Sequence, residues 1–150
     1  MCNKFKAVLG GNVNKFLTAS APLSGEVLNF FRIVFSAQFF EAYGMTETSG
    51  GATATFVGEN KAGHVGGPCC NVKIKLRDIP EAGYLSTSKP PRGEICFFGG
   101  SIMKGYFNNP EKTKESFTED GWLMSGDVGV IMDNGQIKII DRAKNIFKLS

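Results

Sequence analysis

The sequence predicts an α/β fold in which a parallel strand–helix–strand segment is followed by a β-rich segment. Three observations lead to this class. Residues 13–43 contain a strand, an amphipathic helix and a second strand, short apolar runs between Gly or Pro clusters follow from residue 72, and an Asn-Gly pair separates the last two runs. A strand–helix–strand segment of about 30 residues has the size of a βαβ unit.

The first predicted strand covers residues 13–19, an apolar and β-branched stretch that ends at a Ser-Ala-Pro turn. Ser24 is placed to cap the helix. Apolar residues recur after it at helical spacing: Val27, Leu28, Phe31, Val34 and Phe35. The second predicted strand, residues 38–43, is rich in aromatic residues and ends at Gly44. Ligands usually bind in loops at the carboxyl ends of such strands.

The composition changes after this unit. Residues 50–68 are rich in Gly, Ala and Thr, and short strands are expected over residues 72–78 and 94–98. A helix should begin at Asn109, with Pro110 in its first turn, and end near Phe117.

Residues 128–132 and 136–140 should form a hairpin around Asn134-Gly135, with positive φ at both turn positions. No internal repeat accompanies these strands.

Composition and charge exclude several classes of protein. Hydrophobic residues make up 42% of the 150 residues and charged residues 21%, which is typical of a globular chain. The 17 basic and 14 acidic residues are scattered, so we expect no nucleic-acid partner. The most apolar stretch, residues 27–40, is interrupted by polar side chains and predicts no transmembrane segment. No secretory signal precedes it, which favours an intracellular protein.

The four cysteines and the single histidine indicate neither a metal site nor a disulfide framework. The cysteines form no Cys-x-x-Cys pair and have no metal-ligand spacing with His64, so we expect reduced, buried thiols. The adjacent Cys69 and Cys70 are expected to serve in packing, since a bond between neighbours is strained. His64 has no recognisable nucleophile beside it and is expected to be structural or exposed to solvent.

Three short motifs contain residues that could bind a nucleotide. In residues 43–48, Gly44 permits close approach to the backbone, an aromatic ring could stack on a base, and the Thr-Glu pair could hold a phosphate and Mg²⁺. In residues 125–129, a Gly-flanked Asp127 could accept ribose hydroxyls. Residues 141–144 close the last strand with charges. Taken singly, each motif is better explained as a solvated turn or a surface cap.

In order and spacing the motifs resemble the adenylate-forming (AMP-binding) superfamily of acyl-CoA synthetases, luciferases and peptide-synthetase adenylation domains. Residues 18–23 are similar to its adenine-side loop, and residues 43–47 to its Tyr-Gly-x-Thr-Glu motif. Residues 93–113 resemble its Gly-Glu strand and the Gly-Tyr-x-x-x-Pro segment. Residues 125–129 match the ribose motif and residues 141–148 the hinge segment.

Within the superfamily, the chain resembles the long-chain fatty acid CoA ligases. The similarity rests on residues 120–129 and 137–144, including the uninterrupted Ile-Ile-Asp-Arg. Two residues depart from the pattern: Met124 stands where His is usual, and Ser125 where Thr is usual. Because Ser keeps the hydroxyl, the turn before Asp127 should survive.

The resemblance implies a set of ATP and AMP contacts. Ser20, Ala21 and Pro22 would line the adenine side, and Tyr43 would pack on the purine beside Gly44. Asp127 would bind the ribose hydroxyls, and Arg142 would add a second contact with the ribose.

The resemblance also implies catalytic roles. Thr46 would contact the phosphates, and Glu47 would coordinate Mg²⁺ while a fatty acid carboxylate attacks the α-phosphorus. Pyrophosphate would leave at this first step, and the acyl group of the acyl-adenylate would then pass to CoA with release of AMP. Lys144 would lie at the hinge about which a small C-terminal domain rotates.

The implied organisation is a fragment of the large adenylate-forming domain. Residues 1–68 would belong to its α/β nucleotide-binding subdomain, residues 69–141 to a β-rich, distorted-barrel subdomain, and residues 142–150 to the hinge segment. Nothing before residue 13 resembles the phosphate loop, and no C-terminal lysine domain is seen, so we expect the isolated chain to be inactive.

Two alternatives remain open. The chain could be a non-catalytic nucleotide-binding or interaction module derived from this family, or it could serve a different acyl or amino-acid substrate. The resemblance implies a cytoplasmic location, or the cytosolic face of the endoplasmic reticulum or another organelle.

Overall fold

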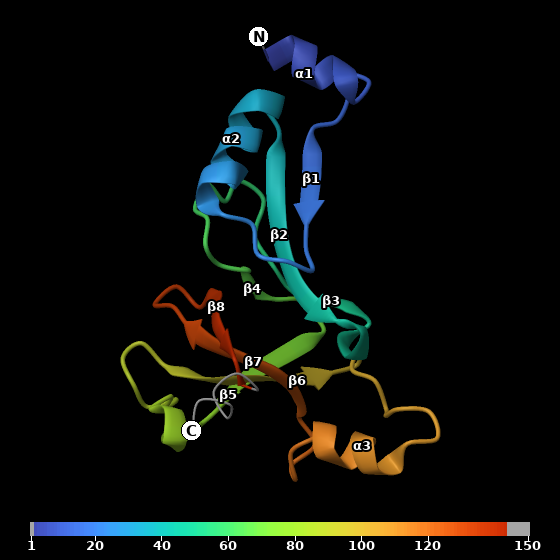
Figure 1. The fold of residues 1–150 in the computed structure, drawn as a ribbon, viewed down its shortest axis with the longest axis vertical. Helices are drawn as coiled ribbons and strands as arrows, with labels where there is room; N and C mark the ends of the chain where they lie inside the picture. The colour runs from blue at the N-terminus through green and yellow to red at the C-terminus, as the bar shows by residue number, and fades with distance from the viewer. Residues whose placement is uncertain (1, 144–150) are drawn as a thin grey trace.

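The computed structural model describes residues 2–143. Figure 1 shows an elongated arrangement with the N-terminal helix at one end and helix α3 near the other. The strands of these residues form two four-stranded sheets, ordered β1-β2-β3-β4 and β5-β6-β7-β8. Neither α1 nor the other helices in this part of the chain have the length and apolar character that a transmembrane span requires.

The predicted parallel unit is confirmed. After helix α1 (Cys2–Val8), which the sequence did not predict, come β1 (Lys15–Thr18), α2 (Gly25–Phe35) and β2 (Gln38–Met45). Strands β1 and β2 pair in parallel, with Thr18 opposite Glu41. Ser24 caps α2 as expected, since its hydroxyl accepts a hydrogen bond from the Val27 amide at 3.3 Å. Four rings pack between α2 and the two strands: Phe16, Phe31, Phe35 and Phe39.

The predicted end of β2 at Gly44 is wrong, because the strand continues to Met45. Gly44 lies opposite Gly51 of β3 (Gly50–Ala54), next to a register shift. A Cβ at Gly44 would lie 1.8 Å from the Gly50 carbonyl oxygen, so this glycine permits close pairing of the two strands. The turn between them is a short helix, η1 (Thr46–Thr48), and β4 (Gly67–Pro68) completes the sheet on β3.

The β-rich segment contains the expected strands, and three of them are longer than predicted. They are β5 (Val72–Arg77), β6 (Arg92–Gly99), β7 (Leu123–Ile131) and β8 (Ile137–Arg142), all antiparallel. A short helix, η2 (Pro80–Ala82), follows β5, and α3 (Pro110–Ser116) begins at its predicted cap, Asn109. One core cluster joins Ala52 of β3 to five residues of this segment: Val72, Ile95, Phe97, Leu123 and Ile137.

This second sheet is open rather than closed into a distorted barrel. Strands β5 and β8 are its two edges, and no pairing joins them within residues 2–143. Closure needs hydrogen bonds between the first and last strands, and the start of β8 instead bonds to the loop before β4. The Val65 amide donates to the Ile137 carbonyl, and the Ile137 amide donates to the Gly66 carbonyl, both at 2.8 Å.

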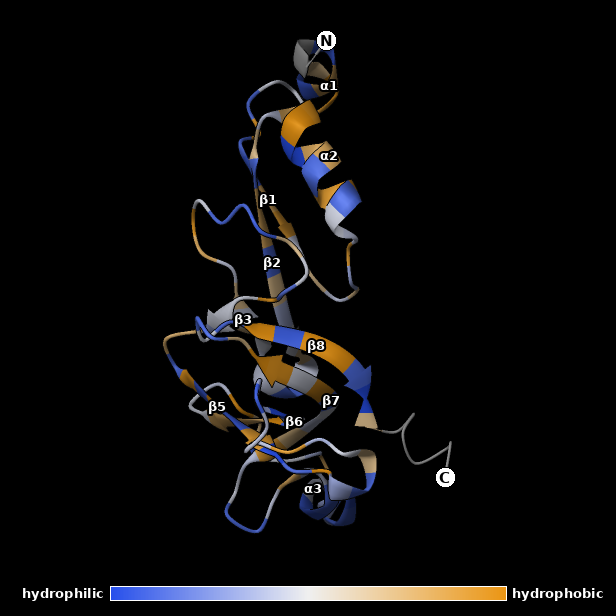
Figure 2. Ribbon diagram, turned by 90° about the vertical axis from the view of Figure 1, so that its left-hand side faces the viewer, coloured by the Kyte–Doolittle hydropathy of each residue, from blue (hydrophilic) through white to orange (hydrophobic). Residues whose placement is uncertain are grey.

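These bonds link the two sheets and bring β7 and β8 close to the end of β2. Figure 2 shows apolar stretches along β7 and β8, and Ala52 of β3 shares one buried cluster with Leu123 of β7 and Ile137 of β8. Side chains add to the junction, because the Gln136 amide donates to the Glu59 carboxylate at 2.7 Å. The junction therefore fixes where residues of β7 lie relative to the carboxyl end of β2.

The β7–β8 hairpin is present, but its turn differs from the prediction. Only Gly135 has positive φ (79°), whereas Asn134 does not. The Gly135 amide donates to the Met132 carbonyl, and the Met132 amide donates to the Gln136 carbonyl, both at 2.8 Å. This is the longer hairpin loop with a left-handed Gly after the turn, so Asn134 needs no positive φ.

Candidate nucleotide-binding site

Tyr43, Asp127 and Arg142 converge at the junction of the two sheets. The Tyr43 hydroxyl donates a hydrogen bond of 2.6 Å to Asp127 Oδ2, although 84 residues separate the two in sequence. Arg142 Nε lies 3.3 Å from Asp127 Oδ1, and the two residues are register partners on β8 and β7. The Asp127 side chain is 16% exposed and that of Arg142 is 75% exposed. The structure thus brings together three residues that the sequence predicted as separate nucleotide contacts.

The turn before Asp127 is built from local hydrogen bonds. The Ser125 hydroxyl accepts from the Asp127 amide at 3.0 Å, so the replacement of the usual Thr by Ser preserves the turn, as predicted. Gly126 has a φ of 74°, and its amide donates to Glu94 Oε1 at 3.0 Å. Glu94 is itself buried and ion-paired with Arg77. The buried Glu94 carboxylate therefore holds the backbone of Gly126, the residue directly before Asp127.

Both the ring and the hydroxyl of Tyr43 are held by neighbouring side chains. The ring lies 6.0 Å, centroid to centroid, from the ring of Phe97 in the core. Burial raises the pKa of the Tyr43 hydroxyl well above its usual range, and the bond to Asp127 raises it further. The hydroxyl therefore stays protonated and acts as a donor at neutral pH. Sequence reasoning assigned Tyr43 to the purine and missed its bond to Asp127, for which a single sequence contains no local signal.

Thr46 and Glu47 lie in η1, directly after β2. Thr46 is exposed and Glu47 is half-buried. Glu47 Oε1 accepts a hydrogen bond of 2.5 Å from the Tyr106 hydroxyl, and this bond raises the pKa of Tyr106. Thr48, which the sequence did not single out, is buried, and its hydroxyl bonds to Met45 and Gly50 to hold the turn.

The donor set around Glu47 fits a hard divalent cation. Within residues 2–143, no three His, Cys, Asp or Glu side chains gather as a complete metal cage. Mg²⁺ does not need one, because it usually keeps several waters and binds one or two carboxylates together with substrate phosphates. One half-buried carboxylate beside an exposed Thr hydroxyl matches that requirement.

The remaining predicted residues have weaker structural support. Ser20, Ala21 and Pro22 lie in an exposed loop after β1. Because Thr18 pairs with Glu41 in parallel register, this loop starts at the same end of the sheet as Tyr43. Lys144, the predicted hinge residue, lies outside the described residues.

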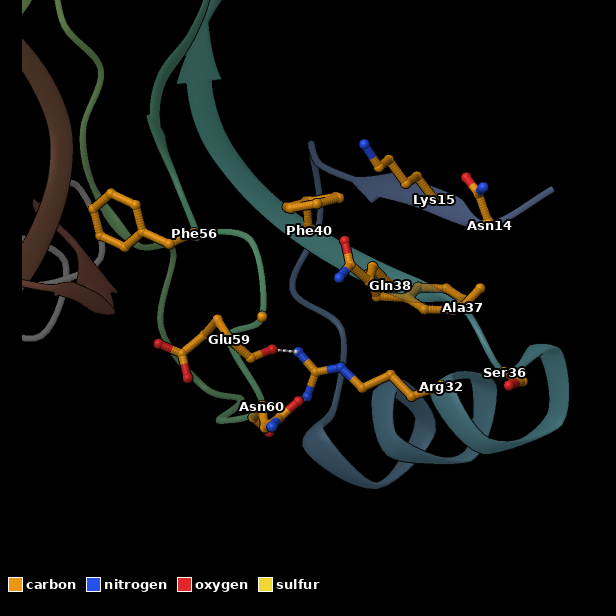
Figure 3. Close-up of a pocket in the computed structure, with 12 residues that line it drawn as sticks. Asn14, Lys15, Arg32, Ser36, Ala37, Gln38, Phe40, Phe56, Glu59 and Asn60 are labelled. Atoms are coloured by element: carbon orange, nitrogen blue, oxygen red, sulfur yellow. Dashed lines mark hydrogen bonds between the residues drawn. The ribbon is translucent and has the colours of Figure 1, made fainter.

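A separate hollow of about 590 Å³ does not coincide with these residues. It lies at the amino end of β2, between α2 and residues 56–60, and Arg32 crosses it to donate to the Glu59 and Asn60 carbonyls (Figure 3). None of the sequence-predicted nucleotide contacts lines it. The candidate site is therefore defined by converging side chains and not by this hollow.

The histidine and cysteines show one correction. His64 is buried and its Nδ1 accepts from the Gly66 amide at 3.2 Å, which confirms a structural histidine. Cys96 is buried, and burial raises the pKa of its thiol to about 12. The expectation of buried thiols fails at Cys70, which is exposed beside the half-buried Cys69 because the two follow β4 in a surface turn.

Comparison with known proteins identifies the family. A family model described as AMP-binding enzyme matches residues 2–107. The chain belongs to this family of AMP-binding enzymes.

Within the family, the predicted resemblance to long-chain fatty acid CoA ligases is confirmed. The chain is 48% identical over 149 residues to fatty acyl-CoA synthetase A of Dictyostelium discoideum and 47% identical to long-chain-fatty-acid–CoA ligase 5 of Mus musculus. Each alignment covers 99% of this chain but 22% and 21% of the relative. The chain thus spans about a fifth of the length of the curated relatives it matches.

Solved structures show the same fold. The A domain of carboxylic acid reductase from Segniliparus rugosus, in complex with AMP and a co-purified carboxylic acid, superposes with a TM-score of 0.78 at 35% identity, over 96% of this chain and 22% of that one. ATP-bound MatB from Rhodopseudomonas palustris has a TM-score of 0.73 at 32% identity, over 86% of this chain and 25% of that one.

Proposed function

We propose that this chain provides nucleotide contacts of a long-chain fatty acid–CoA ligase. The reaction joins a fatty acid to CoA through an acyl-adenylate, converting ATP to AMP and pyrophosphate. The observation that carries the proposal is the convergence of Tyr43, Asp127 and Arg142 on one point. The similarity to curated ligases supports the same assignment.

Asp127 is the proposed acceptor for the ribose hydroxyls. An ionised carboxylate has about four acceptor positions on its two oxygens, so Tyr43 and Arg142 leave room for hydroxyl donors. Arg142 keeps positive charge beside the carboxylate and, being largely exposed, is free to turn toward a bound nucleotide. We propose that Tyr43 presents its ring to the purine beside Gly44, with Ser20, Ala21 and Pro22 closing the adenine side.

Thr46 and Glu47 are the proposed phosphate and metal contacts. Mg²⁺, when bound, supplies charge neutralisation for the phosphates. Glu47 would hold it through a carboxylate oxygen, and Thr46 would donate its hydroxyl to a phosphate oxygen. Both residues follow β2 directly, so the phosphates would lie at the carboxyl end of the parallel strands, the usual ligand position in such sheets.

The wider assignments are also proposals. Residues 1–68, 69–141 and 142–150 would form parts of the nucleotide-binding subdomain, the β-rich subdomain and the hinge segment, with Lys144 at the pivot. Fatty acid and CoA would meet the acyl-adenylate in the complete ligase. We propose an intracellular location, either cytoplasmic or on the cytosolic face of the endoplasmic reticulum or another organelle; two relatives from Arabidopsis thaliana are named peroxisomal.

Calorimetric titration with AMP, without metal, tests the nucleotide assignment. We expect Asp127→Asn to weaken AMP binding by tenfold or more, because a hydrogen bond to a charged group contributes about 1.5–3 kcal/mol. Asp133→Asn is the matched control, since Asp133 is exposed in the β7–β8 turn. Equal AMP affinity in the wild-type chain and Asp127→Asn would contradict the assignment. If AMP binding depends on Asp127 but an acyl-adenylate analogue binds no more tightly than AMP, the non-catalytic module is favoured.

A further inference from the structure

The segment from residue 105 to residue 113 brings a tyrosine to the proposed metal ligand. The sequence marks this segment as a motif, but the proposed nucleotide contacts leave it without a role. Its Tyr106 hydroxyl donates to Glu47 Oε1 at 2.5 Å, across a sequence separation of 59 residues. The bond joins two motifs at the same place in the fold.

Tyr106 is itself held by three restraints from its own motif. Its amide donates to Thr113 Oγ1 at 2.8 Å, and the Lys112 ammonium lies 4.4 Å from the centroid of its ring. Gly105 adopts a φ of 157°, and a Cβ there would lie 2.7 Å from Thr113 Cγ2. Only glycine therefore allows the chain to bring Tyr106 this close to α3.

The part of the loop just before this segment, residues 101–103, also fixes the backbone of the turn that contains Glu47. The Met103 amide donates to the Glu47 carbonyl at 2.8 Å, and the Ser49 hydroxyl donates to the Ser101 carbonyl at 2.8 Å. Figure 1 shows the loop that leaves β6 passing beside the turn that contains η1. Backbone and carboxylate of Glu47 are thus both restrained from one loop.

We propose that Tyr106 is a positioning residue that orients the Glu47 carboxylate for a divalent cation. The Tyr106 hydroxyl is neutral, so its hydrogen bond to Oε1 restrains the Glu47 carboxylate without offsetting its negative charge. A lysine ammonium in the same place would offset that charge. A terminal carboxylate otherwise rotates through a broad range, and fixing it in advance reduces the entropy lost on binding. The inference rests on the proposed role of Glu47 as metal ligand.

Paramagnetic broadening by Mn²⁺ tests this directly on the 150-residue chain, without nucleotide or turnover. Amide signals of residues 46–48 are followed by NMR during Mn²⁺ titration of the wild-type chain, Tyr106→Phe, Glu47→Gln and Tyr84→Phe. Hydrogen-bonded partners of metal ligands typically contribute about 10- to 100-fold to metal affinity. We therefore expect Tyr106→Phe to need about tenfold more Mn²⁺ for the same broadening, and Glu47→Gln to abolish the selective effect.

Tyr84→Phe is the matched control, because Tyr84 packs in the separate cluster of Ile79, Val128 and Ala143. It should broaden as the wild-type chain does. A second variant, Thr113→Val, removes the hydroxyl that holds the Tyr106 amide and should weaken Mn²⁺ binding in the same direction. If Tyr106→Phe changes amide signals far from residues 45–49 and 101–107, its fold is altered, and the Mn²⁺ titration of Thr113→Val then tests the proposal instead.

Two results would overturn the proposal. One is broadening of Tyr106→Phe at the wild-type Mn²⁺ concentration, and the other is a wild-type chain without selective broadening at residues 46–48. The metal-free AMP titration stays independent, because it depends on Asp127. Absence of selective Mn²⁺ broadening in the wild-type chain, with Asp127-dependent AMP binding intact, removes the role of Tyr106. Absence of Asp127-dependent AMP binding, with the Mn²⁺ effect intact, removes the nucleotide assignment.

Discussion

The hydrogen bond between Tyr43 and Asp127 should contribute measurably to the stability of the chain. Tyr43→Phe removes the hydroxyl and leaves the ring against Phe97. The bond is short, at 2.6 Å, and its acceptor is a carboxylate that is 16% exposed. Hydrogen bonds to charged groups contribute about 1.5–3 kcal/mol, and the low exposure limits replacement of the hydroxyl by water.

The other partner of Asp127, Arg142, should contribute much less to the free energy of unfolding. Arg142 is 75% exposed and lies at 3.3 Å from the other carboxylate oxygen. Exposed ion pairs typically contribute about 0–1 kcal/mol, because solvent screens the charges and the side chain loses rotational freedom. We therefore expect Tyr43→Phe to lower the free energy of unfolding by about 2 kcal/mol, and Arg142→Gln by less than about 1 kcal/mol.

Urea unfolding followed by far-ultraviolet circular dichroism measures these differences. A double-mutant cycle of Tyr43→Phe with Asp127→Ala isolates the pairwise energy, and Tyr84→Phe controls for loss of a hydroxyl elsewhere. Trp122, the single tryptophan, reports separately on the second sheet through its fluorescence. A coupling energy below about 0.5 kcal/mol, within the usual error of additivity, would refute the reasoning.

Three further predictions follow from other parts of the chain. Burial lowers the pKa of His64 below its usual 6.5, so on acidification the unfolded chain binds a proton before the folded chain does. The stability of the folded chain should therefore fall as the pH drops below about 6.5. His64→Phe should flatten the pH dependence of the melting temperature, and an unchanged profile would contradict this. Gly44→Ala should destabilise by about 1–3 kcal/mol in urea unfolding, whereas Gly51→Ala, where a Cβ meets nothing within 4 Å, should cost clearly less; equal costs would count against the close strand approach. Acyl-CoA formation by the purified chain should be undetectable in a radiolabelled fatty acid assay, because 150 residues span about a fifth of the ligase relatives; turnover free of contaminating synthetase would disprove this.

The sequence predicted local structure well where the signals were local. Ser24 and Asn109 both cap helices as their side chains predict, and the parallel unit around α2 follows from apolar spacing. Strand β3 was missed because Gly50 to Ala54 contains no alternation of apolar and polar side chains. Its pairing depends on close approach to Gly44, which is a property of the partner strand.

The candidate site was predictable in composition but not in geometry. The motifs identified Tyr43, Glu47 and Asp127, yet each was assigned to a ligand and not to a neighbouring side chain. Tyr43 meets Asp127 across 84 residues and Tyr106 meets Glu47 across 59, and such distances lie beyond any periodicity in one sequence. The packing of the two sheets creates these contacts.

Strand β8 sets the distance between its hydrogen bonds to the loop before β4 and the side chain of Asp127. Its first residue, Ile137, is fixed by Val65 and Gly66, and its last, Arg142, faces Asp127. At about 3.3 Å per residue, the strand sets a separation of roughly 17 Å between these two points. Inserting one residue would turn Arg142 to the opposite face of the sheet, so the length of this strand, as much as any side chain, specifies the charge beside Asp127.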